Sequence, residues 1–228
     1  MHFADADRLL DPRPMPLEMG WQRQNNGVLH VAIRTDMHGC TGAMLEWWFG
    51  SRMGTREYRW WHPIDHIASN WVEGAAGSPV GAIHQAEERF TERPAEQLSI
   101  QFRDPAEAFD AGALAAARAG GAVSAAILAH GGPGFDPRRR PDGAVIGTRL
   151  IHLGRDTPWG MVLRTRFFLG HDLPQVGMPP AEIARIFPDE QAPALLQHCY
   201  DEFTYLSRIL PSLYLAEGPE DVAVTRPW

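Results

Sequence analysis

Six stretches of the chain have the short apolar or alternating pattern of β-strands, in which successive side chains point to opposite faces. They cover residues 27–34, 80–90, 98–103, 123–131, 143–154 and 160–170. The last two are joined by residues 155–159, a link short enough for a hairpin. The pattern predicts a sheet in which antiparallel strands predominate.

Near the C-terminus the period changes, because apolar residues recur every three to four positions and predict one long helix over about 192–210. Its core-facing stripe consists of Leu195, His198, Cys199, Glu202, Leu206 and Ile209. Shorter helices are predicted between Thr41 and Gly50 and from Pro179 to about Phe187. Residues 110–119 fit either a helix or a loop, and residues 55–61 are predicted to be extended.

Several strands followed by one long helix are typical of an α+β fold in which the helix packs against a curved antiparallel sheet. Residues 1–27 are rich in proline and lack periodicity. We therefore expect an N-terminal arm, with a short helix at most, followed by a single domain over residues 28–228.

The composition argues against several classes of function. The formal net charge is −7, which argues against a nucleic-acid partner, since phosphate binding needs clustered Lys and Arg. No apolar run is long enough to suggest a membrane span, and the acidic N-terminus lacks the apolar core of a signal peptide. Cys40 and Cys199 provide neither a disulfide framework nor a thiolate zinc site. We expect a soluble, cytoplasmic protein.

Aromatic residues and two histidines are concentrated in residues 44–70. The aromatic residues include Trp47, Trp48, Tyr58, Trp60 and Trp61. His62 and His66 bracket a Pro-Ile-Asp tripeptide. Such a stretch fits an aromatic core with satisfied histidines, or an apolar pocket in which imidazoles bind a metal or move protons.

A carboxylate also falls on an apolar strand face. In residues 80–90 the more apolar face carries His84 and Glu88, whereas Glu87 lies on the wetter face. A buried carboxylate needs a cation, a metal or a proton, so Glu88 is the candidate ligand. A β-bulge would exchange it for Glu87.

His198 and Glu202 lie one helical turn apart and can chelate one ion, although a buried His–Glu hydrogen bond is the commoner explanation of such a pair taken alone. Together with the His-Pro-Ile-Asp-His element and Glu88, they make two histidines and two carboxylates from three elements. Such a nitrogen and oxygen set suits zinc, and Fe(II) or Mn(II) would also fit.

Several motifs resemble those of the 2,4-diacetylphloroglucinol hydrolase and phloretin hydrolase family, in the same order over about residues 28–210. They are GAMLEWWFG, YRWWHPIDH, the HxxxE strand at 84–88, IHLGR, RTRFFLG and the HxxxE helix at 198–202. The resemblance implies a Bet v 1-like helix-grip domain that encloses a cavity. It also implies a zinc-dependent hydrolase that cleaves the carbon–carbon bond between an acyl group and a polyphenol ring.

By position, the resemblance implies a set of metal ligands and a set of substrate contacts. The ligands are His66, Glu88 (or Glu87), His198 and Glu202. Tyr58 and His152 correspond to residues that contact or protonate the substrate, which would be a small aromatic ketone. Phe167 lies in the strand where the family tends to have a second tyrosine, and Ser69 replaces an expected asparagine.

Further pocket residues and other functions stay open. Trp61, His62 and His84 are candidate pocket residues beside Ser69 and Phe167. Asp65 would either orient a ligating imidazole or cap the next turn. The alternatives to a hydrolase are a carrier of small apolar ligands without catalysis and a non-haem iron oxygenase. A homodimer is one expected assembly.

Overall fold

The computed structural model describes residues 1–51, 53–74, 78–91 and 93–219. Within these residues, eight strands form one antiparallel sheet in the order β1-β2-β8-β7-β6-β5-β4-β3. The strands are β1 (Gly20–Arg23), β2 (Leu29–His38), β3 (His66–Val72), β4 (Ile83–Glu88), β5 (Glu96–Arg103), β6 (Ala125–Pro133), β7 (Thr148–Thr157) and β8 (Gly160–Leu169). The hairpin predicted between the last two strands joins β7 to β8.

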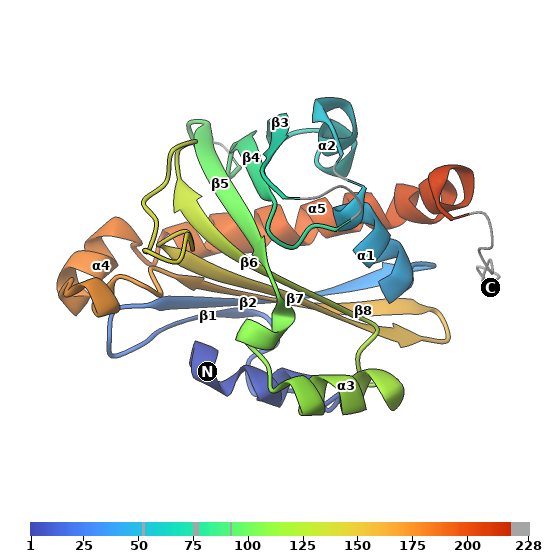
Figure 1. Cartoon of the computed structure of the whole chain (residues 1–228), viewed down its shortest axis with the longest axis horizontal. Helices are drawn as coiled ribbons and strands as arrows, with labels where there is room; N and C mark the ends of the chain where they lie inside the picture. Colours follow the sequence, from blue (N-terminus) through green and yellow to red (C-terminus); the bar gives the residue numbers. More distant parts are fainter. Residues whose placement is uncertain (52, 75–77, 92, 220–228) are drawn as a thin grey trace.

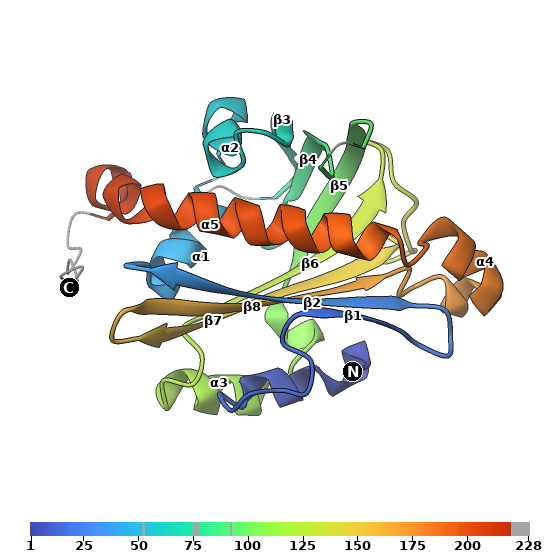
Figure 2. The same cartoon turned by 180° about the vertical axis from the view of Figure 1, so that it is seen from behind.

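One long helix lies along a face of this sheet, with smaller helices around it (Figures 1 and 2). The α-helices are α1 (Gly42–Gly50), α2 (Thr55–Trp61), α3 (Ala111–Ala119), α4 (Pro180–Ile186) and α5 (Gln191–Glu217). Short 3₁₀ helices are η1 (Phe3–Leu10), η2 (Pro105–Glu107) and η3 (Pro174–Val176). The predicted α+β architecture, a helix held by a curved antiparallel sheet, is confirmed.

The two faces of the sheet carry separate hydrophobic cores. The larger core packs the sheet against α1, α2 and α5 and includes Trp48, Phe203 and Leu206. The smaller core lies under η1 and α3 on the opposite face and includes Leu9 and Phe168. Figure 1 shows η1 and α3 together on the side of the sheet away from α5. In the part of the chain described, no helix is both long and apolar enough to cross a membrane.

The N-terminal residues contribute to the sheet. Residues 1–27 were expected to form an arm with a short helix at most; they contain η1 and also the edge strand β1, which pairs with β2. The sequence gives little sign of β1, because it is only four residues long and half of it is exposed. Arg164 on β8 binds this segment through the carbonyls of Asp11 and Arg13 and the carboxylate of Glu18.

The prediction that residues 55–61 are extended is wrong, since they form α2. The run of aromatic residues favours a strand by propensity. However, the Glu57 side chain accepts a hydrogen bond from the backbone N–H of Gly54 (3.1 Å), and this bond stabilises the start of the helix. The correction matters because α2 positions Tyr58 and Trp61.

The long helix continues seven residues beyond its predicted end at Leu210, through Pro211. Proline has no N–H and therefore leaves the carbonyl four residues earlier without its helical partner. That carbonyl belongs to Ser207, and it accepts a hydrogen bond from the thiol of Cys40 (3.6 Å). This hydrogen bond from Cys40 thus offsets the helical hydrogen bond that Pro211 cannot donate.

Candidate functional site

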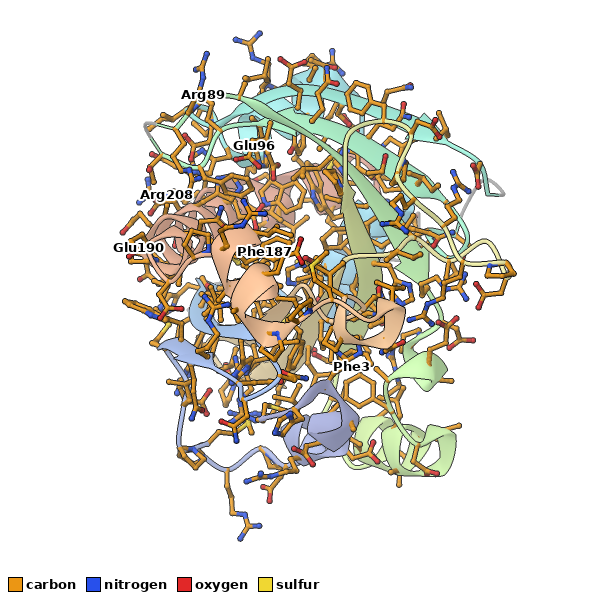
Figure 3. All side chains as sticks on the ribbon, turned by 90° about the vertical axis from the view of Figure 1, so that its left-hand side faces the viewer. Phe3, Arg89, Glu96, Phe187, Glu190 and Arg208 are labelled. Carbon is orange, nitrogen blue, oxygen red and sulfur yellow. The ribbon has the colours of Figure 1, made fainter. Side chains whose placement is uncertain are left out.

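A cavity of about 370 Å³ lies between the sheet and α5. Its walls are mainly apolar and include Phe49, Phe102, Leu150 and Leu195. A pocket of this size and character suits a small organic ligand. Figure 3 views the molecule from the end at which α4 lies, where Phe187 and Glu96 border the same cavity.

Four buried polar side chains meet beside the cavity, and three of them, Glu88, His198 and Glu202, border it. His66 on β3 is paired with Glu88 on β4, and the register shift between His66 and Ala68 produces this pairing. Directly opposed residues of antiparallel strands point to the same face. His198 and Glu202 project from α5, one turn apart, and all four side chains of this cluster are less than a tenth exposed.

The distances between these groups are short. The Nε2 atom of His66 lies 3.7 Å from Oε2 of Glu88 and 3.7 Å from Oε2 of Glu202. One ligand-type atom from each of His66, His198 and Glu202 lies within 4.8 Å of the others. The arrangement brings together the four ligands that the sequence resemblance implied.

Both imidazoles are held through Nδ1. The Nδ1 atom of His66 is 2.8 Å from the backbone carbonyl of Tyr58, and that of His198 is 3.0 Å from Oδ2 of Asp65. A carbonyl only accepts hydrogen bonds, so Nδ1 of His66 carries the proton and Nε2 has the free lone pair. Nε2 of His66 is buried without a hydrogen-bond partner. Metal-binding histidines are oriented in this way by carbonyl and carboxylate partners.

Burial and neighbouring charges shift the pKa values of all four groups in the cluster. Burial, followed by the charge of Glu88, raises the pKa of Glu202 to about 8, and burial also raises the pKa of Glu88. Burial lowers the pKa of His66. Burial acts in the same direction on His198, but the hydrogen bond to Asp65 and the charges of Glu88 and Glu202 outweigh it and raise its pKa to about 9. A divalent cation would compensate both carboxylates.

A neighbouring group of His62, Asp65 and His198 also has metal-binding side chains close together. Hydrogen bonds already occupy most of its polar atoms, although Nε2 of His62 is buried without a hydrogen-bond partner. The N–H of Asp65 donates to Nδ1 of His62 (3.1 Å), and Oδ2 of Asp65 accepts from His198 and from the N–H of Thr91 (3.1 Å). We therefore interpret this group as support for His198, whose imidazole Asp65 orients.

Comparison with known proteins shows which family this chain belongs to. The family model of the DAPG hydrolase PhiG domain matches residues 1–215. The chain belongs to this family. It is 26% identical over 241 residues to 2,4-diacetylphloroglucinol hydrolase from a Pseudomonas species, covering 95% of this chain and 77% of that protein. The enzyme of the same name from Pseudomonas protegens is also 26% identical, with 95% of this chain and 74% of that protein covered.

The relatives' names identify them as hydrolases, which supports an enzymatic role for this family member. Among solved structures, the crystal structure of Ara h 8.0201 matches with a TM-score of 0.47 and 13% identity, covering 82% of this chain and 99% of that chain.

Most of the predicted site residues of this DAPG hydrolase family member border the cavity. They are Tyr58, Trp61, His84, Glu88, His152, Phe167, His198 and Glu202. The hydroxyl of Tyr58 donates to Oε2 of Glu88 and its ring stacks on that of His66 (centroids 3.7 Å apart). Nδ1 of His152 is 2.7 Å from the hydroxyl of Thr165. Tyr58 thus contacts both His66 and Glu88 and borders the cavity.

The other candidates lie behind the cavity wall. Ser69 is hydrogen bonded to His84 (2.8 Å), and the ring of His62 stacks on that of His198 (4.9 Å between centroids, 9° between planes). His66 lies behind Tyr58. Glu88 is 6% exposed, whereas Glu87 is partly exposed on the other face of β4. The strand alternation therefore favours Glu88 as the ligand.

Four polar residues at the cavity were not predicted. Arg93 follows β4, Glu96 begins β5, Thr148 begins β7 and Gln191 begins α5, and all four border the cavity. They lie at the ends of elements, where no hydrophobic period marks a side chain as inward-facing. Sequence spacing alone gave no signal for them.

Proposed function

We propose that this protein is a zinc-dependent hydrolase that cleaves the carbon–carbon bond between an acyl group and a polyphenol ring. Its substrate would be an acylphloroglucinol or a related aryl ketone such as phloretin. The observation that carries the proposal is the buried set of His66, Glu88, His198 and Glu202 beside an apolar cavity. The names of the two Pseudomonas relatives support the substrate class.

The residues fit a metal ion. Nε2 of His66 is buried and unpartnered, and it faces two carboxylate oxygens at 3.7 Å. Two imidazoles and two carboxylates match the ligand preferences of zinc. Bound there, zinc would polarise a carbonyl oxygen or lower the pKa of a water molecule. A non-catalytic carrier would gain nothing from this set, because burying two carboxylates without a cation is costly.

In the overall reaction, water adds across the aryl–acyl bond: the acyl carbon gains the hydroxyl as a carboxylic acid, and the ring carbon gains a proton. We assign the proton donor to Tyr58, because its hydroxyl borders the cavity and binds Glu88. His152 is assigned to substrate contact, since burial lowers its pKa to about 3 and keeps the ring neutral at physiological pH. The apolar walls would hold the aromatic ring and exclude bulk water.

The direct test is acyl release from 2,4-diacetylphloroglucinol and from phloretin, followed by chromatography. We expect activity in zinc-loaded protein, loss after treatment with a chelator, and recovery when zinc is returned. Tyr58→Phe should retain zinc but lose at least about 100-fold in kcat, the range of a positioned proton donor. Oxygen-dependent turnover with iron would favour the oxygenase instead, and ligand binding without turnover in any metal form would favour the carrier.

A further inference from the structure

His84 on β4 is held rigidly at the cavity wall. The ring of Trp71 stacks on it, with centroids 4.8 Å apart and planes 16° apart. The ring of Tyr58 contacts it edge to face, at 5.0 Å and 86°. The His84 side chain is 3% exposed and borders the cavity. Its orientation toward a bound molecule is therefore fixed by packing.

A chain of hydrogen bonds fixes the proton on this ring. The backbone carbonyl of Met53 accepts from the hydroxyl of Ser69 (3.1 Å) and from the indole N–H of Trp71 (3.0 Å). A hydroxyl has one proton to donate, and a carbonyl has none. Since the Ser69 proton goes to Met53, its oxygen accepts from Nε2–H of His84 at 2.8 Å. The reverse tautomer would leave the bond between Ser69 and Met53 unmade.

The remaining nitrogen of His84, Nδ1, then carries a lone pair. No hydrogen bond from another described residue reaches it, and the ring lies on the cavity. Burial lowers the pKa of His84 to about 3, which keeps the ring neutral. A neutral imidazole locked in this tautomer accepts a hydrogen bond at Nδ1 and has no proton to donate there.

We propose that His84 selects ligands that carry a phenolic hydroxyl, by accepting a hydrogen bond at Nδ1, and that Ser69 is the positioning residue that fixes this tautomer. This inference rests on the proposed function, and it identifies a phenolic hydroxyl on the aromatic ring of the substrate as the group that the site recognises. The hydroxyl would lie close to the reacting group, because Tyr58 contacts His84 and also binds Glu88. A methoxy group at the same place would present no proton.

The tautomer is tested by ¹⁵N NMR of protein with labelled histidine, with the His84 signals assigned from their loss in His84→Phe. We expect the Nε2–H form in the wild type and, in Ser69→Ala, in which Nε2 has lost its acceptor, a larger share of the Nδ1–H form. Ser69→Thr retains the hydroxyl and should retain the wild-type tautomer. An Nδ1–H form in the wild type, or no change in Ser69→Ala, would overturn the proposal.

Selectivity is tested by quenching of tryptophan fluorescence with 2,4,6-trihydroxyacetophenone and its trimethoxy analogue. We expect His84→Phe to weaken binding of the hydroxylated ligand by about tenfold, in the range of one hydrogen bond, while the methoxylated ligand changes by less than about twofold. Equal losses for both ligands, or unchanged preference for the hydroxylated one, would overturn the role of His84. Zinc content is measured in each sample, so that a disturbed metal site is recognised.

This result is separable from the reaction itself. If the wild type prefers the hydroxylated ligand through His84 but releases no acyl group, the proposed function fails and the inference about ligand recognition stands. If acyl release occurs and His84→Phe keeps the same preference, the inference alone fails.

Discussion

Two clusters of buried charge on opposite sides of this sheet differ in how completely their atoms are paired. Around Asp172, which is 1% exposed, Oδ1 accepts from Arg140 and from Arg149 (2.6 Å), and Oδ2 accepts from the N–H of Gly147 (2.9 Å). At the cavity, by contrast, Nε2 of His66 has no partner and faces two carboxylates.

The contrast separates a structural cluster from a binding cluster. The Asp172 cluster balances its carboxylate with two guanidinium groups and joins the segment before β7 to the loop after β8. The cavity cluster has two carboxylates, and the unpartnered Nε2 of His66 lies 3.7 Å from an oxygen of each. Buried charges are costly unless they are paired, and we propose that a bound cation pairs the two carboxylates of the cavity cluster.

The largest effect on stability is expected in the Asp172 cluster. Asp172→Asn should lower the free energy of unfolding by about 3–5 kcal/mol, because it leaves a buried guanidinium without its counter-charge. Urea unfolding measures this change, and zinc bound per folded chain should not change. Asp36→Asn is the control, since Asp36 forms an exposed ion pair with Arg34 and should cost no more than about 1 kcal/mol. A loss at Asp172 as small as that of the control would contradict the structural role.

In the cavity cluster, Glu202→Gln should weaken zinc binding without lowering the stability of the metal-free protein. We expect zinc affinity to fall by more than about 100-fold, since changes to residues outside the ligand set alone cost about 10–100-fold. Competition with a chelating dye measures the affinity. In the presence of a chelator the variant should be at least as stable as the wild type, because the substitution removes a buried carboxylate whose pKa is raised by burial. Unchanged zinc affinity would remove Glu202 from the ligand set.

Zinc itself should distinguish the two clusters. At a free concentration 100 times Kd it should stabilise the wild type by about 2.7 kcal/mol, which raises Tm by about 5–10 °C in a chain of this size. The same rise is expected in Asp172→Asn from a lower starting Tm, and none in Glu202→Gln. Differential scanning calorimetry with and without zinc decides this; an equal rise in Glu202→Gln would mean that zinc binds elsewhere.

A smaller effect on zinc affinity is expected at Asp65, which contacts His198 from outside the set of four candidate ligands. Asp65→Asn weakens the hydrogen bond that orients His198 and should lower zinc affinity by about 10–100-fold without abolishing binding. The dye competition used for Glu202→Gln gives the value. Affinity equal to that of the wild type would show that α5 alone positions His198.

Some residues of the cavity cluster could be predicted from local sequence patterns and others could not. His198 and Glu202 follow from helical spacing and Glu88 from strand alternation, because each depends only on its own element. The pairing of His66 with Glu88 depends on a register shift between two strands, which no single stretch of sequence reveals. The resemblance to a known family implied His66 as a candidate ligand instead.

Elsewhere, side-chain contacts outweighed local propensity. Aromatic residues led to an extended prediction for residues 55–61, although Glu57 stabilises the start of α2. Pro211 does not end α5, and the thiol of Cys40 binds the carbonyl that the proline leaves free. The tautomer of His84 depends on Ser69 and a backbone carbonyl. Contacts between residues distant in sequence cannot be predicted from one chain without its fold.

We propose that His66, Glu88, His198 and Glu202 bind one metal ion. Crystals soaked with zinc and measured at wavelengths on both sides of the zinc absorption edge locate the bound zinc. We expect one strong anomalous peak among these four side chains, absent in crystals of His198→Ala. A peak at another position, or none here after soaking without chelators, would contradict the claim.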